Sequence, residues 1–470
     1  MSVPATATRA LAARDQLTLA LDRAAGARPI EGNRLEHHPD SPRALNAMLA
    51  AIAAARRWVH FENYIIRDDA TGRHFADALA ERARAGVRVR VLYDALGSFG
   101  TSRRYWRQLV QAGVEVRAFH PLLTRHALDL LARDHRKLLV ADGAWAMTGG
   151  LCIGDEWAGD PARGRRPWRD TMIAVSGPAA AALDGTFARI WRHAGAPLPP
   201  DELDADPASG GDSTVRVVEG VPGRARVYRA VELLAASAAE RLWITDAYLI
   251  APAPLYASLL DAARSGVDVR LLVPGTTDLP VLRNFTRVGY RDLLRAGVRV
   301  FEYQGPMIHA KTIVVDRRWA RVGSSNLNVS SLLTNYELDL AAECEGLTEE
   351  LARQFRHDLA SSQEIVLQPR RMRLPPRLAA GSAPDEGDAP HKRSGYELGA
   401  VAVVALRRVA GGLRRAIAAT AALTCAVVGG LLVVFPRIMG VVFAAGAFTL
   451  ALAFGVYALE RRRARDSDDG

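Results

Sequence analysis

Two histidine–lysine–aspartate sets with the same spacing are the residues of this sequence best suited to chemistry. The pattern His-x-Lys-x-x-x-x-Asp occurs twice, at His135, Lys137 and Asp142 and at His309, Lys311 and Asp316. Only three of the 61 basic residues are lysines, and two of those three lie in these motifs. Because arginine serves equally well on a solvated surface, the retained lysines indicate a site that needs a compact ammonium group.

Two imidazoles and two ammonium groups in one pocket fit phosphodiester exchange. One imidazole attacks phosphorus to give a phosphohistidine, and the other protonates the leaving alkoxide and then deprotonates the incoming hydroxyl. The lysines neutralise the non-bridging oxygens, a task that metal ions perform elsewhere. The three cysteines also lie far apart without metal-ligand spacing. We therefore expect no metal ion and no other cofactor.

The motifs need strands to position them, and the sequence supplies a strand after each histidine. Residues 136–141 and 310–315 are apolar stretches, and alternate positions on a strand face the same side, so each histidine projects with its lysine. Upstream, each half repeats one order of elements: an aromatic strand (58–66 or 243–250), a helix ending in Gly86 or Gly266, and a β-branched strand. The sequence thus predicts a duplicated α/β domain.

The remaining segments divide the chain further. We expect an N-terminal helix at 1–30, the two domains at 31–205 and 206–368, a basic Pro- and Gly-containing linker at 369–395, and an interfacial segment with a two-helix transmembrane hairpin at 396–463. The alternative for the last segment is a buried helix pair in a third domain. Arginines flank the hairpin on both sides, which places both ends and the catalytic body in the cytoplasm. The net charge of +10 favours an anionic partner, here an anionic membrane surface.

At these motifs the sequence resembles the phospholipase D superfamily over residues 32–367. The resemblance implies a pseudo-twofold pair of domains, each a mixed sheet flanked by helices. It also implies that Ser324 and Asn326 contact phosphate or lysine, that Asp170 and Glu337 orient the histidines, and that Asp142 and Asp316 brace the strand turns. The first half departs from the family with Cys152 in place of the usual asparagine, and a thiol is a poor substitute for an amide.

Within the superfamily, the stretches 62–66, 153–156 and 167–171 resemble bacterial cardiolipin synthases. The resemblance implies a phosphatidyltransferase of the inner membrane that acts on phosphatidylglycerol, with phosphatidylethanolamine as another donor. Three alternatives stay open: a hydrolase releasing phosphatidic acid, a nuclease, and a binding protein with a decayed site. The hairpin argues against nucleic acid as a partner. We expect His135 to be the nucleophile and His309 the acid; the sequence gives no oligomeric state.

Overall fold

The computed structural model describes residues 16–121 and 132–367, which belong to one compact unit. The predicted linker at 369–395 and the predicted hairpin at 396–463 lie outside these residues. Across the described ranges, no helix is both long enough and apolar enough to cross a membrane.

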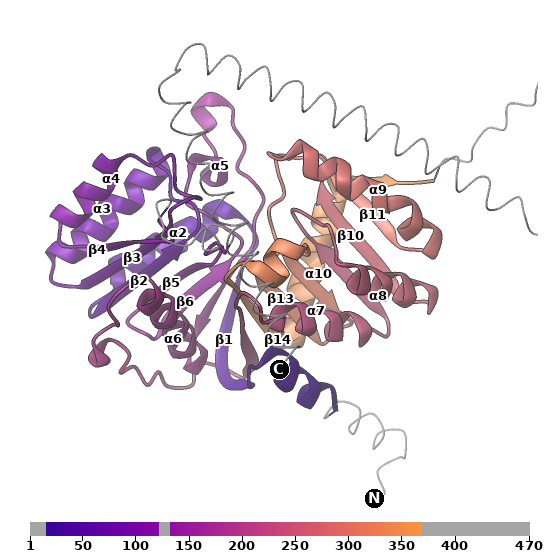
Figure 1. Ribbon diagram of the computed structural model, residues 1–470, viewed down its shortest axis with the longest axis horizontal. Coiled ribbons are helices and arrows are strands. Elements are labelled where there is room, and N and C mark those ends of the chain that lie inside the picture. Colours follow the sequence, from indigo (N-terminus) through magenta and orange to yellow (C-terminus); the bar gives the residue numbers. More distant parts are fainter. Residues whose placement is uncertain (1–15, 122–131, 368–470) are drawn as a thin grey trace, which may run out of the picture. The chain divides into compact units, whose positions relative to one another are not determined.

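The two halves of the chain repeat one order of strands (Figure 1). The first half has the order β1 (Ile30–His38), β7 (Met172–Ser176), β6 (Trp145–Gly149), β5 (Lys137–Ala141), β2 (Trp58–Asn63), β3 (Arg88–Asp94) and β4 (Glu115–Phe119). The second half has β8 (Ser213–Gly220), β14 (Glu337–Glu343), β13 (Trp319–Gly323), β12 (Thr312–Val315), β9 (Arg241–Thr245), β10 (Asp268–Pro274), β11 (Arg299–Tyr303) and the added edge strand β15 (Ser362–Ile365). The identical order confirms the predicted α/β class and its duplication.

The prediction of two separate sheets needs a correction. In each half, three strands run parallel and the others pair antiparallel, so each half-sheet is mixed, as predicted. However, β1 also pairs antiparallel with β8, through Ile30 opposite Val215 and Asn33 opposite Ser213. This pairing leaves no free edge on β1 or β8 and makes one continuous 15-stranded sheet.

Helices cover both faces of this sheet and divide its core into three parts. In the first half they are α2 (Ser41–Ala54), α3 (Ala70–Arg84), α4 (Arg103–Gln111), α5 (Asp155–Ala158) and α6 (Pro178–His193). In the second half they are α7 (Arg226–Ala236), α8 (Ala253–Arg264), α9 (Pro280–Ala296) and α10 (Glu345–Ala360). One apolar cluster packs under α2 to α4 and another under α7 to α9, while a third contains α6 and α10 and runs through both halves. The halves therefore share a core.

Local sequence signals set the ends of these helices. The side chains of Asp40, Asp69 and Ser102 accept hydrogen bonds from backbone N–H groups in the first turns of α2, α3 and α4, as N-cap residues do. Gly86 and Gly266 have φ angles of +88° and +92°, a left-handed conformation that glycine adopts without strain. The predicted helix-to-strand turns at both glycines are confirmed.

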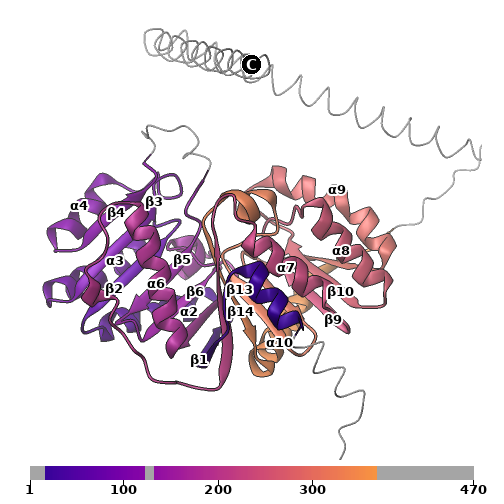
Figure 2. The same ribbon diagram turned by 60° about the horizontal axis from the view of Figure 1, so that its bottom comes forward.

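The N-terminal helix packs on the second half of the chain, as Figure 2 shows beside α7. Within residues 16–25, which are helical, Leu21 and Ala25 are buried in the cluster that contains α7. Asp22 of this helix accepts a hydrogen bond from Arg216 of β8 at 2.9 Å. The helix at residues 16–25 thus lies against the second half, although the first half follows it directly in the sequence.

Candidate active site

Strand direction brings the two motifs to one edge of the sheet. Strand β5 runs antiparallel to β2 and begins where β2 ends, and β12 begins in the same way where β9 ends. His135 lies two residues before the start of β5, and His309 lies three residues before the start of β12. Polar side chains at the carboxyl ends of parallel strands are the usual place for an active site in α/β folds.

Two crossed backbone contacts then join the halves at this edge. The N–H of His135 donates to the carbonyl of Tyr336 at 2.9 Å, and the N–H of His309 donates to the carbonyl of Arg169 at 2.7 Å. Each contact belongs to an isolated parallel bridge, which pairs the residue before a motif histidine in one half with the residue before an acidic residue in the other. The crossing places each histidine beside a carboxylate that the opposite half supplies.

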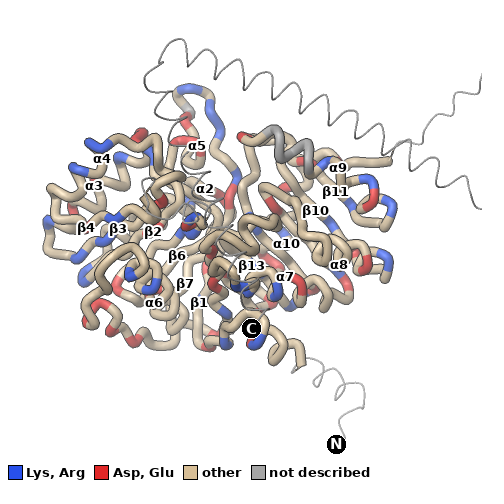
Figure 3. The backbone as a smooth tube through the Cα atoms, in the orientation of Figure 1, with Lys and Arg blue, Asp and Glu red and all other residues tan. Residues whose placement is uncertain are grey.

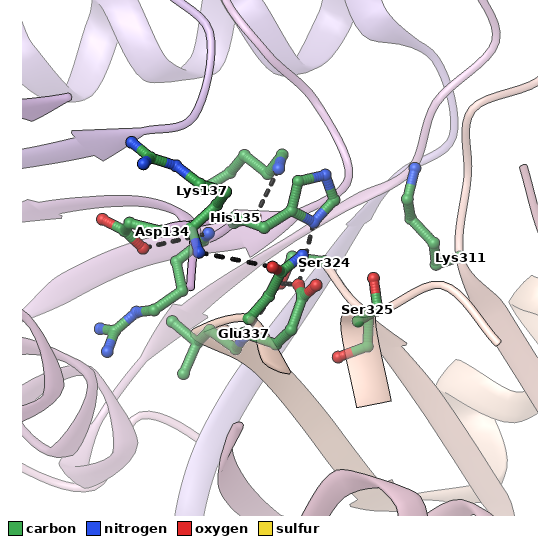
Figure 4. A network of polar contacts seen from close by, with 12 residues as sticks. Asp134, His135, Lys137, Lys311, Ser324, Ser325 and Glu337 are labelled. Atoms are coloured by element: carbon green, nitrogen blue, oxygen red, sulfur yellow. Dashed lines mark hydrogen bonds and ion pairs between the residues drawn. The ribbon is translucent and has the colours of Figure 1, made fainter. Parts of the chain in front are cut away.

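Both histidines are hydrogen bonded to those carboxylates. His135 Nδ1 lies 3.0 Å from Glu337 Oε2 (Figure 4), and His309 Nδ1 lies 2.8 Å from Asp170 Oδ2. The two carboxylates are fully buried. Because Nδ1 is engaged, Nε2 of each ring is the nitrogen that can meet a substrate. The structure thus pairs the predicted site residues across the halves, an exchange that the sequence did not indicate.

A second donor fixes each carboxylate, and the two halves use different residues for it. The Ser324 hydroxyl donates to Glu337 Oε2 at 2.5 Å. The Trp157 indole N–H donates to Asp170 Oδ2 at 3.1 Å, and its ring lies edge-on to His309. Serine has no counterpart at Gly150, where a Cβ would lie 2.3 Å from Asp170 Oδ1. Trp157 was not predicted as a site residue, although it directly follows the stretch 153–156.

The two motif lysines are fully buried and equivalently placed. Each ammonium group donates to the backbone carbonyl of its own motif histidine, Lys137 to His135 and Lys311 to His309. Lys137 Nζ also lies 5.0 Å from the ring centroid of Tyr64, and Lys311 Nζ lies 6.0 Å from that of Tyr248. Both tyrosines also lie against the motif histidines and were not predicted as site residues.

Burial controls the charge states of this cluster. Desolvation, with the charge of Lys311 next, lowers the pKa of His309 to about 4. Desolvation also lowers the pKa of His135, against the opposing effect of Glu337. For Lys311, desolvation lowers the pKa to about 8. Near pH 7, His309 is therefore neutral while Lys311 keeps its charge.

Arg136, between the first histidine and its lysine, points to the opposite face of β5, as strand alternation requires. Its guanidinium forms a buried ion pair with Glu62 at 3.0 Å and donates to the Thr186 hydroxyl at 2.7 Å. The equivalent position in the second half is Ala310, which is also buried. Thus the first motif, unlike the second, has a charged side chain that forms an ion pair on the face of the strand opposite its lysine.

Asn326 and Cys152 occupy equivalent positions after β13 and β6. Both side chains are buried, and Oδ1 of Asn326 has no hydrogen-bond partner within the described parts of the chain. Such an orphaned amide oxygen is a group that a ligand can satisfy. Burial raises the pKa of the Cys152 thiol, which favours its protonated form.

Asp142 and Asp316 hold the strand turns below the site. Asp142 has a φ angle of +55°, and its carboxylate accepts three backbone N–H groups at Arg56, Arg57 and Trp58, at 2.7–2.9 Å. Asp316 has a φ angle of +51° and accepts the equivalent N–H groups of residues 239–241. Both motif aspartates therefore bind the backbone that leads into β2 and β9.

Metal ligation has no candidate among the residues that the structure describes. No group of three or more His, Cys, Asp or Glu side chains there could hold a metal ion. The cations next to the histidines are the two lysines.

A duplicated α/β body that joins two His–Lys pairs in one buried site is the architecture of the phospholipase D class. The family described as "Cardiolipin synthase, PLD-like domain" matches residues 48–191 and 232–359. Cardiolipin synthase A of Pseudomonas aeruginosa is 36% identical over 348 residues, which cover 73% of this chain and 70% of that protein. Cardiolipin synthase of Halalkalibacterium halodurans is 35% identical over 324 residues, covering 67% and 64%.

A solved structure shows the same fold. The phosphatidylserine synthase of Haemophilus influenzae Rd KW20 has a TM-score of 0.60 with 14% sequence identity, covering 74% of this chain and 92% of its own. The chain belongs to the cardiolipin synthase family of the phospholipase D superfamily. It is an enzyme of the phosphatidyltransferase type.

Proposed function

We propose that this enzyme makes cardiolipin by moving a phosphatidyl group from one phosphatidylglycerol to the glycerol hydroxyl of another. The crossed histidine–carboxylate pairs are the observation that carries this proposal. A carboxylate on Nδ1 directs Nε2 toward phosphorus and stabilises the charge that the imidazole gains. The relatives named cardiolipin synthase support the choice of reaction.

The reaction has two steps through a covalent intermediate. Nε2 of His135 attacks phosphorus and forms an N–P bond while the P–O bond to the glycerol headgroup breaks, and His309 gives its proton to the departing alkoxide. His309 then takes the proton of the acceptor hydroxyl, whose oxygen attacks phosphorus as the N–P bond breaks. The products are cardiolipin and glycerol. The side chain of His135 is slightly more exposed than that of His309, 11% against 6%, which supports this order.

The lysines balance the charge of the phosphodiester. The anionic group enters next to two buried ammonium groups, where low dielectric strengthens the attraction. Its negative charge also raises the pKa of the imidazoles, so that one of them can carry the proton that the leaving group needs. Ser324 contributes by holding Glu337. The Nδ2 group of Asn326 can donate to a non-bridging oxygen, whereas its unpartnered Oδ1 can only accept a hydrogen bond.

The acceptor decides between transfer and hydrolysis. Water in place of the glycerol hydroxyl would give phosphatidic acid by the same steps. Purified full-length enzyme is incubated with phosphatidylglycerol alone and with added phosphatidylethanolamine, and thin-layer chromatography separates the products. We expect cardiolipin, whereas phosphatidic acid as the sole product would overturn the synthase proposal. Cleavage of DNA by the same preparation would support a nuclease instead.

Trapping the intermediate tests the order of the histidines. Brief incubation with phosphorus-labelled phosphatidylglycerol, alkaline quenching and mass spectrometry locate the phosphohistidine. Label on His135 is expected, and label on His309 alone would reverse the two roles.

The cellular location of the enzyme is part of the same proposal. The segment at 396–463 anchors the enzyme in the bacterial inner membrane, with the catalytic body on the cytoplasmic side.

A further inference from the structure

Loops from both halves surround the site at the catalytic edge, by which we mean the sheet edge where β2, β3, β9 and β10 end and β5 and β12 begin. The loop 95–102 leaves β3 there, and the loop 275–279 leaves β10. The segments that follow β6 and β13 start at the same edge, because these strands run antiparallel to β5 and β12. These segments therefore start at the end of the sheet where the histidines lie.

These segments expose large apolar side chains to solvent. Phe99 is 73% exposed, and four more exposed apolar residues belong to the same edge: Leu96, Leu279, Val329 and Leu333. They come from both halves of the chain. Apolar side chains gathered at one end of a protein mark a binding surface, because each is unfavourable in water.

The first of these loops is fixed directly on the site. The Ser98 hydroxyl donates to the carbonyl of Tyr64 at 3.1 Å and accepts the N–H of Ile66 at 3.0 Å. The ring of Tyr64 lies 4.8 Å from that of His135. On the other side, the Tyr248 hydroxyl donates to Asp278, the neighbour of exposed Leu279, at 2.7 Å. The residues next to Phe99 and Leu279 thus contact the two tyrosines that lie against the motif histidines.

Exposed arginines accompany the apolar side chains. They lie at the start of α4 and in the loops after α5 and β8: Arg103, Arg104, Arg163, Arg165, Arg166 and Arg224. Figure 3 shows the arginines of the loop beside α5 at its tip. The arginines of this loop and Trp168 line a cleft, and the Trp168 ring lies 6.0 Å from that of His309. Three carboxylates line the same cleft, and each has a partner: Asp69 caps helix α3, Asp155 accepts from Thr71, and Glu156 pairs with Arg67.

We propose that the catalytic edge is a docking surface for an anionic lipid bilayer, into which Phe99, Leu96 and Leu279 insert while the arginines bind lipid phosphates. This inference rests on the proposed lipid substrate and adds the face of the body that meets the membrane. Apolar side chains between arginines match the apolar interior and anionic surface of such a bilayer. Docking there presents the headgroups to both histidines without lifting the lipid into water.

The test compares one substrate in two physical states, using the full-length enzyme. Phosphatidylglycerol is offered in vesicles, and a short-chain phosphatidylglycerol is offered as dispersed monomers. We expect Phe99→Ser to lower the rate on vesicles about tenfold, the order of effect for losing one inserted aromatic side chain. The rate on monomers should stay within about twofold. Val110→Ser is the matched control, because Val110 is also exposed, at 57%, but lies at the far end of α4.

A second pair of variants tests the role of the arginines. Arg165→Glu combined with Arg166→Glu should lower the vesicle rate, and the loss should shrink when phosphatidylglycerol is diluted in phosphatidylcholine or when salt is raised. Arg84→Glu, an exposed residue at the end of α3 away from the catalytic edge, should leave the rate unchanged. Equal losses on vesicles and monomers would overturn the proposal, as would no loss on vesicles.

A readout independent of activity separates this inference from the proposed function. An environment-sensitive fluorophore on Phe99→Cys should shift to the blue on adding phosphatidylglycerol vesicles, and the same fluorophore on Val110→Cys should not. This result holds whether the products are cardiolipin or phosphatidic acid. Equal spectra for the two positions would contradict docking. A change in oligomeric state caused by Phe99→Ser would instead identify the surface as a contact between copies and would also overturn the proposal.

Discussion

The two histidines differ in what holds their carboxylates. A hydroxyl donates to Glu337 and an indole N–H donates to Asp170, so the two ends of the site are chemically unequal although the fold is duplicated. Glycine at position 150 leaves room for Asp170, and the tryptophan supplies the donor that serine supplies on the other side. The two histidine–carboxylate pairs therefore have similar geometry, but different residues donate to their carboxylates.

Trp157 should act as a positioning residue for His309. We expect Trp157→Phe to lower kcat about tenfold, because removing one hydrogen bond of ~1.4 kcal/mol leaves Asp170 less fixed. Ser324→Ala is the matched variant for Glu337 and His135. The pH dependence of diethyl pyrocarbonate labelling, mapped to each histidine by mass spectrometry, distinguishes positioning from packing. The Trp157 variant should shift the titration of His309 alone, and an equal shift of His135 would contradict this role.

Lys311 should set the alkaline limit of activity. Burial lowers its pKa to about 8, so the ammonium group is charged below that pH and neutral above it. The stabilisation of the phosphodiester charge is then present below about pH 8 and lost above it. We expect kcat/KM to fall up to about tenfold per pH unit beyond that point. A profile that stays flat to pH 10 would show that Lys311 does not titrate there.

At the scale of elements, the strand turns keep each motif in register with its half-sheet. Asp142 and Asp316 close the turns after β5 and β12 and bind the backbone before β2 and β9. Each aspartate thus ties the far end of the motif strand to the neighbouring strand. The histidine lies at the other end of the same strand.

Asp142→Ala should destabilise the fold more than it impairs the chemistry. The change removes three backbone hydrogen bonds to a carboxylate and leaves alanine in a left-handed conformation, which together cost about 2–4 kcal/mol. Thermal unfolding should show a lower midpoint, with near-normal kcat per folded enzyme at low temperature. Asp316→Ala should behave in the same way. A loss of kcat at an unchanged midpoint would instead place the aspartate in the reaction.

At the scale of the whole molecule, three features make the halves one body. Strand β1 pairs with β8, the cluster around α6 and α10 spans both halves, and the N-terminal helix packs on the second half. A site whose histidines and carboxylates come from opposite halves requires such a fixed arrangement. A small rotation of one half would break both hydrogen bonds at once.

The N-terminal helix should contribute measurably to stability. Asp22→Asn removes the charge that pairs with Arg216, whose side chain is 1% exposed, and we expect a loss of about 1–3 kcal/mol. Arg23→Ala, an exposed change on the same helix, is the control and should have little effect. Thermal unfolding and limited proteolysis report both variants. Equal behaviour of the two would mean that the helix does not depend on this contact.

The sequence alone determined the repeated α/β order and the two motifs. Alternation, glycine-terminated helices and motif spacing are local properties, so the strands after His135 and His309 and the turns at Gly86 and Gly266 could be predicted. Family resemblance then named Asp170 and Glu337 as the orienting carboxylates. The identity of both carboxylates therefore rests on the resemblance and not on a pattern in this sequence.

Only the tertiary structure decided how these parts meet. The partner of each histidine comes from the opposite half, the two expected sheets are one through β1 and β8, and Trp157 replaces a serine as the second donor. None of these has a local signal, because each joins segments far apart in the chain or depends on their packing. Burial of the whole cluster likewise sets the pKa values of His309 and Lys311, since desolvation depends on every surrounding element and on no single motif.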